Sequence, residues 1–146
     1  PKNVEVAIGT SFSDVIDFCG GFKTEPKKII MGGPMMGFAV PTINYPVLKN
    51  NNAILAFSAA KTAEAEKPET PCIRCARCVN VCPMHLTPLF MNMFAKARRW
   101  SEVEEEYRIM DCMECGSCQY VCPARIPLVQ QFRTAKFAIR QQAAKK

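Results

Sequence analysis

The chain contains the runs Cys72-Ile-Arg-Cys75-Ala-Arg-Cys78-Val-Asn-Val-Cys82-Pro83 and Cys112-Met-Glu-Cys115-Gly-Ser-Cys118-Gln-Tyr-Val-Cys122-Pro123. Both read C-x2-C-x2-C-x3-C-P, so eight of the nine cysteines fall in two groups with the same spacing. This spacing is typical of cysteines that hold [4Fe–4S] clusters, because three thiolates along one turning loop can each bind a different iron atom of a cubane. The sequence therefore predicts two such clusters.

The fourth cysteine of each run lies just beyond its loop, where a proline turns the chain away. In the two-cluster pattern this fourth cysteine binds the cluster of the other run. We therefore expect the metal ligands to divide into two sets. Cluster A is expected to be held by Cys72, Cys75, Cys78 and Cys122, and cluster B by Cys112, Cys115, Cys118 and Cys82. Iron bound only by cysteine leaves no open coordination site, so no catalytic residue is expected.

Two other interpretations of the cysteines are less favoured than clusters. One is a zinc-stabilised interaction module, but zinc usually takes two sulfurs from each of two turns, and a third cysteine in one short loop would be crowded. The other is a disulfide framework, which the dense spacing and the absence of a signal-peptide pattern disfavour. Cys19 stands apart and is expected to be a small core residue of a helix.

The composition sets outer limits on the function. The 146 residues are 49% apolar and carry a formal net charge of +6, and no apolar run reaches the roughly 18 residues that a membrane span needs. Each oxidised cluster with its four thiolates adds about −2, which lowers the net charge to roughly +2. We therefore expect neither a nucleic-acid partner nor a membrane span. Because the chain begins at Pro1 and not at Met, it is expected to be a piece of a longer protein.

Residues 72–146 are expected to be all-helical, because no alternating run rich in Val, Ile or Thr separates the cysteine groups. Thr87 before a proline is a candidate helix N-cap, and Ser101 with Glu104 forms a capping-box pattern for a second helix. Apolar residues then recur at intervals of three and four. The two stripes are Leu89, Phe90, Met93, Phe94, Ala97 and Trp100, and Leu128, Phe132, Ala135 and Ile139.

Residues 60–71 are polar and contain two prolines, which predicts a linker. The segment before it, 1–59, predicts a small α+β unit. Its helix is expected to begin after the Ser11/Asp14 capping-box pattern and to end at Gly20-Gly21. Its strands are expected at 3–9, 28–31, 47–48 and 53–57.

The chain resembles the family of C subunits of Rnf-type ion-translocating electron transport complexes. The resemblance rests on the strand–helix–Gly-Gly unit, the stretches Met31-Gly-Gly-Pro-Met-Met-Gly37 and Ala53-Ile-Leu-Ala-Phe-Ser58, and the doubled cysteine runs. The first unit is similar to the soluble-ligand-binding β-grasp domain. The implied architecture is α+β, with a β-grasp-like unit over 1–59 and an all-helical two-cluster ferredoxin domain over 72–146.

The resemblance implies a peripheral subunit on the cytoplasmic side of a membrane, in bacteria the inner membrane. Its partners would be the other subunits of the complex and a redox donor or acceptor protein. The complex would move electrons between reduced ferredoxin and NAD and couple this flow to ion transport. The chain alone is not expected to catalyse turnover. FMN and NADH would bind, if anywhere, in the family's larger N-terminal portion, since this chain has no G-x-G-x-x-G after a strand.

The helical ferredoxin domain also resembles iron–sulfur subunits of the succinate dehydrogenase or heterodisulfide reductase type. An iron–sulfur subunit of another redox complex is therefore the alternative function, although the upstream unit counts against it. His85 is expected at the surface or an interface, since cysteines supply all eight cluster ligands.

Charged residues next to the two cysteine groups predict different reduction potentials. Arg74, Arg77 and Arg125 flank cluster A, whereas Asp111 and Glu114 flank cluster B. Nearby positive charge stabilises a reduced cluster and carboxylates destabilise it. We therefore hypothesise that cluster A has the higher reduction potential.

Overall fold

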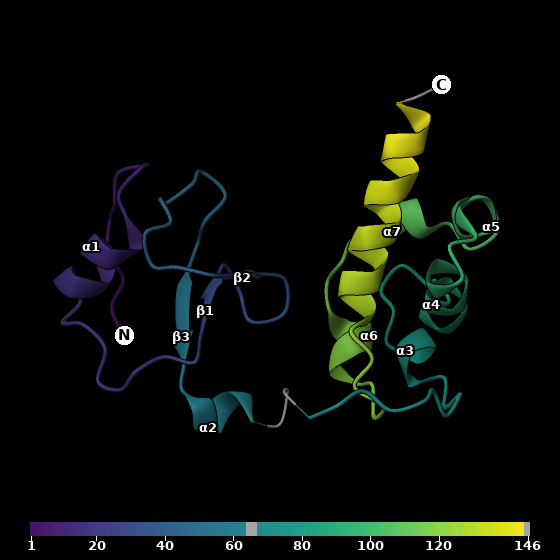
Figure 1. Ribbon diagram of the computed structural model, residues 1–146, viewed down its shortest axis with the longest axis horizontal. Coiled ribbons are helices and arrows are strands. Elements are labelled where there is room, and N and C mark those ends of the chain that lie inside the picture. The colour runs from purple at the N-terminus through teal and green to yellow at the C-terminus, as the bar shows by residue number, and fades with distance from the viewer. Residues whose placement is uncertain (64–66, 145–146) are drawn as a thin grey trace. The chain divides into compact units, whose positions relative to one another are not determined.

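The structure is a computed structural model that describes residues 1–63 and 67–144 (Figure 1). It has two compact units, Pro1–Lys67 and Pro68–Lys146. Their boundary falls within the stretch 60–71 that the sequence predicts as a linker, and a short helix, α2 (Ala59–Thr62), occupies the start of that stretch. Residues 64–66 of the expected linker lie outside the described residues. A small sheet in the first unit and helices in the second confirm the α+β class.

The first unit is built on a three-stranded antiparallel sheet. Its strands are β1 (Lys28–Met31), β2 (Phe38–Val40) and β3 (Ile54–Phe57), in the order β2-β1-β3 (Figure 1). The central strand pairs Ile30 with Ala39 on one side and with Leu55 on the other. The sequence predicts β1 and β3. It does not predict β2, because Gly37 and Pro41 bound a stretch too short to show an alternating pattern.

Helix α1 (Phe12–Phe18) begins and ends where the sequence predicts. The Ser11 side chain accepts a hydrogen bond from the backbone N–H of Asp14 at 3.1 Å, which satisfies one of the free N–H groups of the first turn. Gly20 and Gly21 follow with φ of 99° and 71°, a left-handed conformation that stops the helix. Cys19 lies at the C-cap and is partly exposed, so it is less buried than the core position expected for it.

Two expected strands of this unit are wrong. Residues 3–9 are irregular and Ile8 is 69% exposed, because no neighbouring strand pairs with that stretch. Residues 47–48 also form no strand. Val47 instead exchanges backbone hydrogen bonds with Gly9 and Thr10 in a loop, next to an isolated bridge between Ser11 and Pro46.

The segment 32–37 is a tight turn between β1 and β2. Gly32 has φ of 98°, which glycine adopts without strain. A Cβ on Gly37 would lie 2.5 Å from the carbonyl oxygen of Gly33 and 2.5 Å from Cγ2 of Ile30. This close backbone approach requires glycine. Met35 and Met36 at the tip are exposed.

The described residues of the second unit contain helices joined by loops and no strand. Its elements are α3 (Arg77–Asn80), α4 (Pro88–Lys96), α5 (Trp100–Glu105), the 3-10 helix η1 (Ile109–Asp111), α6 (Ser117–Tyr120) and α7 (Leu128–Ala143) (Figure 1). α3 begins at residue 77 and α6 at 117, while α4 begins at 88 and α7 at 128. The unit is therefore an internal duplication with an offset of 40 residues.

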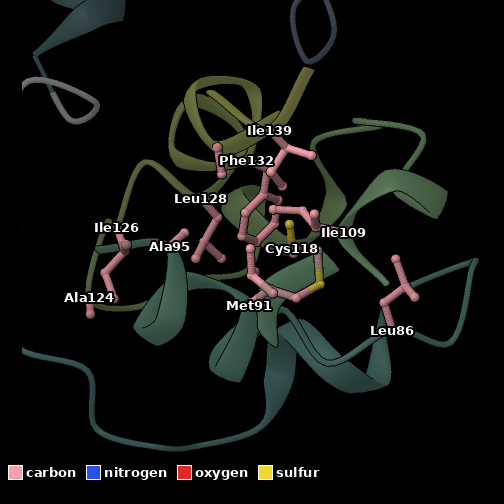
Figure 2. Close-up of a cluster of buried hydrophobic side chains, with 12 residues drawn as sticks. Leu86, Met91, Ala95, Ile109, Cys118, Ala124, Ile126, Leu128, Phe132 and Ile139 are labelled. Atoms are coloured by element: carbon pink, nitrogen blue, oxygen red, sulfur yellow. The ribbon is translucent and has the colours of Figure 1, made fainter. Parts of the chain in front are cut away.

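Helix α4 packs against α7 and encloses the core of the second unit (Figure 2). Met91, Val103, Ile109 and Phe132 have no exposed surface. Leu128, Phe132, Ala135 and Ile139 are all buried, which confirms the stripe predicted for α7. Cysteines belong to this core. Cys118 is a member of it, and Cys78, Cys82, Cys112 and Cys122 pack against it.

The stripe predicted for α4 is wrong at several positions, although Phe94 and Trp100 do pack against the core. The buried residues of α4 are Pro88, Met91, Asn92 and Ala95, whereas Phe90 and Met93 of the predicted stripe are exposed. Apart from Asn92, the helix is apolar on every side up to Ala95, so spacing alone could not select the buried face. Phe90 and Phe94 instead stack on the ring of Tyr107, with centroids 5.8 and 4.7 Å apart.

The cap predictions in this unit have mixed outcomes. Thr87 is the N-cap of α4, although its side chain makes no capping hydrogen bond. Helix α5 begins at Trp100 after Arg99 and not after Ser101, because the Arg99 side chain pairs with Glu102 across the first turn. Among the described residues, no helix has the length and hydropathy needed to cross a membrane.

Candidate metal centres

Both cysteine loops follow the same backbone path. Arg74 and Ala76 in the first loop have φ of 55° and 58°, and Glu114 and Gly116 in the second have φ of 57° and 84°. These left-handed residues stand at the same positions between the cysteines and turn each loop back on itself. Three of the four are not glycine, and such strained positions persist where the surroundings require them, often at ligand-binding sites.

The connection after each run is repeated as well. His85 and Arg125 have φ of 51° and 54°, and their N–H groups donate to the carbonyls of Cys82 and Cys122 at 3.1 and 3.2 Å. The turn directs the chain away from the fourth cysteine and into α4 or α7. His85 is exposed and lines neither of the two spaces described next.

The structure gathers the eight cysteines around two separate spaces, which we name site A and site B. Site A is a cavity of about 540 Å³, and site B is a much smaller space of about 20 Å³. Site A is lined by Cys72, Cys75, Cys78 and Cys122, and site B by Cys82, Cys112, Cys115 and Cys118. Each space combines three cysteines of one run with the fourth of the other, and the ligation of clusters by these sets stays a prediction.

Each site offers four cysteine sulfurs, the number that a [4Fe–4S] cluster needs. At site B, backbone N–H groups of Leu86 and Glu114 donate to the sulfurs of Cys82 and Cys112, both at 3.4 Å, and such bonds stabilise thiolates. Within the described ranges, no three His, Cys, Asp or Glu side chains are gathered tightly enough for a single metal ion. Site B has space for about one water molecule, so its walls must move apart to hold a cubane.

Site A contains a buried polar group without a partner. Asn92 of α4 is 8% exposed and lines the cavity, and its Oδ1 atom has no hydrogen-bond partner among the described residues. An unpaired buried amide destabilises a fold by about 1–3 kcal/mol. The wall of site A therefore carries a group suited to a polar occupant.

Burial raises the pKa of three of the thiols in the folded chain. It raises the pKa of Cys118 to about 12, and the neighbouring Cys112 and Cys115 raise it further. Burial also raises the pKa of Cys78, where backbone N–H groups oppose the change and Cys122 adds to it. Burial raises the pKa of Cys112 in the same way. Metal binding at these positions must release protons.

The charges around site B differ from those expected. Glu114 Oε2 accepts from Arg133 Nε at 2.8 Å, and Glu114 Oε1 lies 3.0 Å from Lys136 Nζ. Burial acts to raise the pKa of Glu114, but the bonds from Arg133 and Lys136 outweigh it and lower the pKa overall. Asp111 is likewise paired, with Arg108 at 2.5 Å. Both carboxylates expected to flank cluster B are therefore paired with cations, which the sequence did not indicate.

Sequence reasoning missed Lys136 and Asn92 as neighbours of the sites. A lysine and an asparagine on amphipathic helices are usually exposed, so neither residue carries a local signal. The duplication could have indicated both, because α4 and α7 must cover equivalent sites.

Two sequence families match the chain. A family described as a 4Fe-4S dicluster domain matches residues 65–123, which include all eight clustered cysteines. A family described as an SLBB domain matches residues 1–39. These matches support [4Fe–4S] clusters in the second unit and a soluble-ligand-binding type of domain in the first.

The curated relatives are parts of ion-translocating complexes. The C subunit of the proton-translocating ferredoxin:NAD(+) oxidoreductase complex of Clostridium ljungdahlii is 49% identical over 93% of this chain and 29% of its own length. The C subunit of the ion-translocating oxidoreductase complex of Rhodobacter capsulatus is 45% identical over 100% and 28%. The Na(+)-translocating counterpart of Acetobacterium woodii is 45% identical over 99% and 32%. The chain thus spans about three tenths of these relatives, and it belongs to the family of C subunits of ion-translocating oxidoreductase complexes.

Proposed function

We propose that this chain carries electrons through two [4Fe–4S] clusters, as part of a peripheral subunit of a membrane-bound ferredoxin:NAD oxidoreductase complex. The observation that carries the proposal is the grouping of the eight cysteines into two sets of four, each with three cysteines from one run and one from the other. The proposed ligands are Cys72, Cys75, Cys78 and Cys122 at site A, and Cys82, Cys112, Cys115 and Cys118 at site B.

A [4Fe–4S] cluster supplies a group that is reduced and oxidised by one electron without making or breaking bonds to a substrate. The residues of the chain hold it by four thiolates, donate N–H···S bonds and surround it with apolar side chains. At site B these side chains include Met91 of α4 and Phe132 of α7, both without exposed surface. Such a wall keeps water away from the sulfurs.

The two sites adjoin each other, which suits electron transfer between them. Helix α3 carries Cys78 of site A and packs against α6, which carries Cys118 of site B. Cys78 is also among the groups that raise the pKa of Cys118. A short path through the chain supports one-electron transfer from one site to the other.

The wider role rests on the relatives, whose names describe complexes that translocate protons or sodium ions. We propose the same kind of complex for this chain, on the cytoplasmic side of a bacterial inner membrane. FMN and NADH are proposed to bind, if at all, in the larger N-terminal portion implied by the family resemblance. The relatives favour this assignment over an iron–sulfur subunit of the succinate dehydrogenase or heterodisulfide reductase type.

Anaerobic reconstitution of the chain with iron and sulfide tests the proposal. We expect about eight iron and eight sulfide per chain, a brown colour, and an EPR signal after dithionite reduction. A colourless chain that binds zinc and stays EPR-silent after reconstitution would support the zinc-stabilised interaction module instead. The matched control replaces Cys19, which lies outside both sites, with serine and should change none of these measurements.

A further inference from the structure

Lysines occupy equivalent positions in the two halves of the second unit, but their surroundings differ. Lys96 of α4 and Lys136 of α7 are offset by the same 40 residues as their helices. The Lys96 side chain is 42% exposed and pairs with Glu69, which is 39% exposed. Lys136 is only 5% exposed. The duplication thus supplies an internal comparison for the buried lysine.

Lys136 is held against the ligand loop of site B. Its Nζ donates to the carbonyl oxygen of Cys112 at 2.5 Å and to Oε1 of Glu114 at 3.0 Å. Cys112 is a proposed ligand, and Glu114 lies between two proposed ligands of the same loop. An ammonium group in this position is fixed near the sulfurs of site B by two contacts from one short segment.

The burial of this charge determines how strongly it acts. Arg133, which is also partly buried, pairs with the other oxygen of the Glu114 carboxylate, so Lys136 and Arg133 both contact that group. A buried charge acts through a lower dielectric than an exposed one, and salt screens it less. The buried ammonium group of Lys136 therefore stabilises negative charge added at site B.

Site A has no equivalent network at the matching positions. The residue that corresponds to Glu114 is Arg74, and the one that corresponds to Arg133 is Met93. Arg74 and Arg77 are exposed, as is Lys96, so solvent screens their charges.

We propose that Lys136 sets the reduction potential of site B above that of site A, so that site B holds the electron when one is shared between them. The inference rests on the proposed function and reverses the order expected from the sequence. In the step concerned, a one-electron donor is oxidised and site B is reduced. Lys136 keeps its proton and its charge, and no bond to it forms or breaks.

The test is an EPR-monitored redox titration of the reconstituted chain, with signals assigned beforehand in variants that lack a ligand of one site. Lys136→Met should lower the equilibrium constant for reduction of site B about tenfold, which for one electron is about 59 mV. Lys96→Met is the matched control. It should change the potential of either site by no more than about a third of the shift expected for Lys136→Met. Glu114→Gln should raise the potential of site B, because it removes the carboxylate and leaves both cations.

A charge effect should lower the reduction potential of site B in Lys136→Met and raise it in Glu114→Gln. Damage to the fold would shift the potential of both variants in the same direction. Equal shifts in Lys136→Met and Lys96→Met, or an unmoved site B potential, would overturn the inference while leaving the proposed function intact. If Lys136→Met assembles no cluster at site B, Glu114→Gln decides, since an unchanged or lowered potential there contradicts the inference. A parent chain that binds no cluster would overturn the proposed function as well.

Discussion

Sites A and B arise from the same repeated pattern, and their loops share left-handed residues at matching positions. Their surroundings are nevertheless different. Cys72 and Cys75 of site A are exposed, whereas Cys118 of site B is buried and belongs to the core. The comparison teaches that the repeated loop fixes where the sulfurs lie, while the helix that follows fixes how polar and how accessible each site is.

Equivalent residues of α4 and α7 account for much of this difference. Asn92 in the wall of site A corresponds to Phe132 in the wall of site B, and exposed Lys96 corresponds to buried Lys136. Differences at equivalent positions of the two helices therefore accompany the difference between the open site A and the closed site B.

The fourth cysteine of each run is proposed to bind the cluster of the other run. Replacing this cysteine should have the largest effect, the loss of one whole cluster. Cys82→Ser is expected to remove the cluster of site B and spare that of site A, although Cys82 belongs to the first run. Cys122→Ser should do the reverse. Each variant should retain about four of the eight iron atoms, and the surviving EPR signals of the two should differ. The same surviving signal in Cys82→Ser and Cys115→Ala would support the exchange, and different ones would contradict it.

The packing of site B predicts a large loss of stability when its wall is removed. Phe132→Ala should destabilise the second unit by about 3–5 kcal/mol, because a fully buried aromatic side chain leaves a cavity. The apparent thermal midpoint of the cluster-loaded chain should fall by more than about 10 °C at a fixed scan rate. Asn92→Ala at the equivalent position of site A should cost much less, since Oδ1 of Asn92 has no partner to lose. Equal losses would mean that both walls are packed alike.

The buried thiols predict a pH dependence that is steeper at site B. Burial raises the pKa of Cys112 and brings that of Cys118 to about 12, whereas at site A it raises that of Cys78. Binding must release these protons, so it becomes more favourable as pH rises until each thiol ionises unaided. Above pH 9 the apparent affinity of site B should keep rising by up to about tenfold per pH unit for Cys118.

Competition with an iron chelator in the Cys122→Ser and Cys82→Ser variants, which isolate sites B and A, measures this dependence. Parallel pH profiles for the two variants would contradict it.

The exposed arginines at site A predict the smallest effect. Arg77→Glu should change the free energy of reduction of site A by no more than about 0.5–1 kcal/mol, because solvent screens a charge on the surface. Raising the ionic strength to about 1 M should remove most of the shift, since screening then acts over about 3 Å. A salt-independent shift larger than that of Lys136→Met would show that surface charge, and not buried charge, orders the two sites.

Local signals were sufficient to predict part of this molecule. The cap at Ser11, the stop at Gly20-Gly21 and the buried stripe of α7 depend on neighbours in the sequence, and all three are confirmed. The two cysteine groups are set by spacing within twelve-residue runs, so the sequence predicts the ligand residues directly, and their ligation stays a prediction.

Features that depend on distant partners could not be predicted. The residues 3–9 alternate like a strand, but no strand lies beside them. Helix α4 is apolar on most sides, and only its packing on α7 selects the face that carries Met91. The role of Lys136 depends on a contact with Glu114, 22 residues away, which no local pattern indicates.

The exchange of the fourth cysteine has a consequence for the origin of the duplication. Under the proposed ligation, a single repeat supplies three thiolates to one site and its fourth to the other. One repeat alone therefore cannot complete a centre. An ancestor with one copy would have worked as a pair of identical chains, each supplying one cysteine to the cluster of its neighbour. Joining the copies would have made this ligation intramolecular, at high effective concentration. It would also have freed the halves to diverge, which identical partners cannot do.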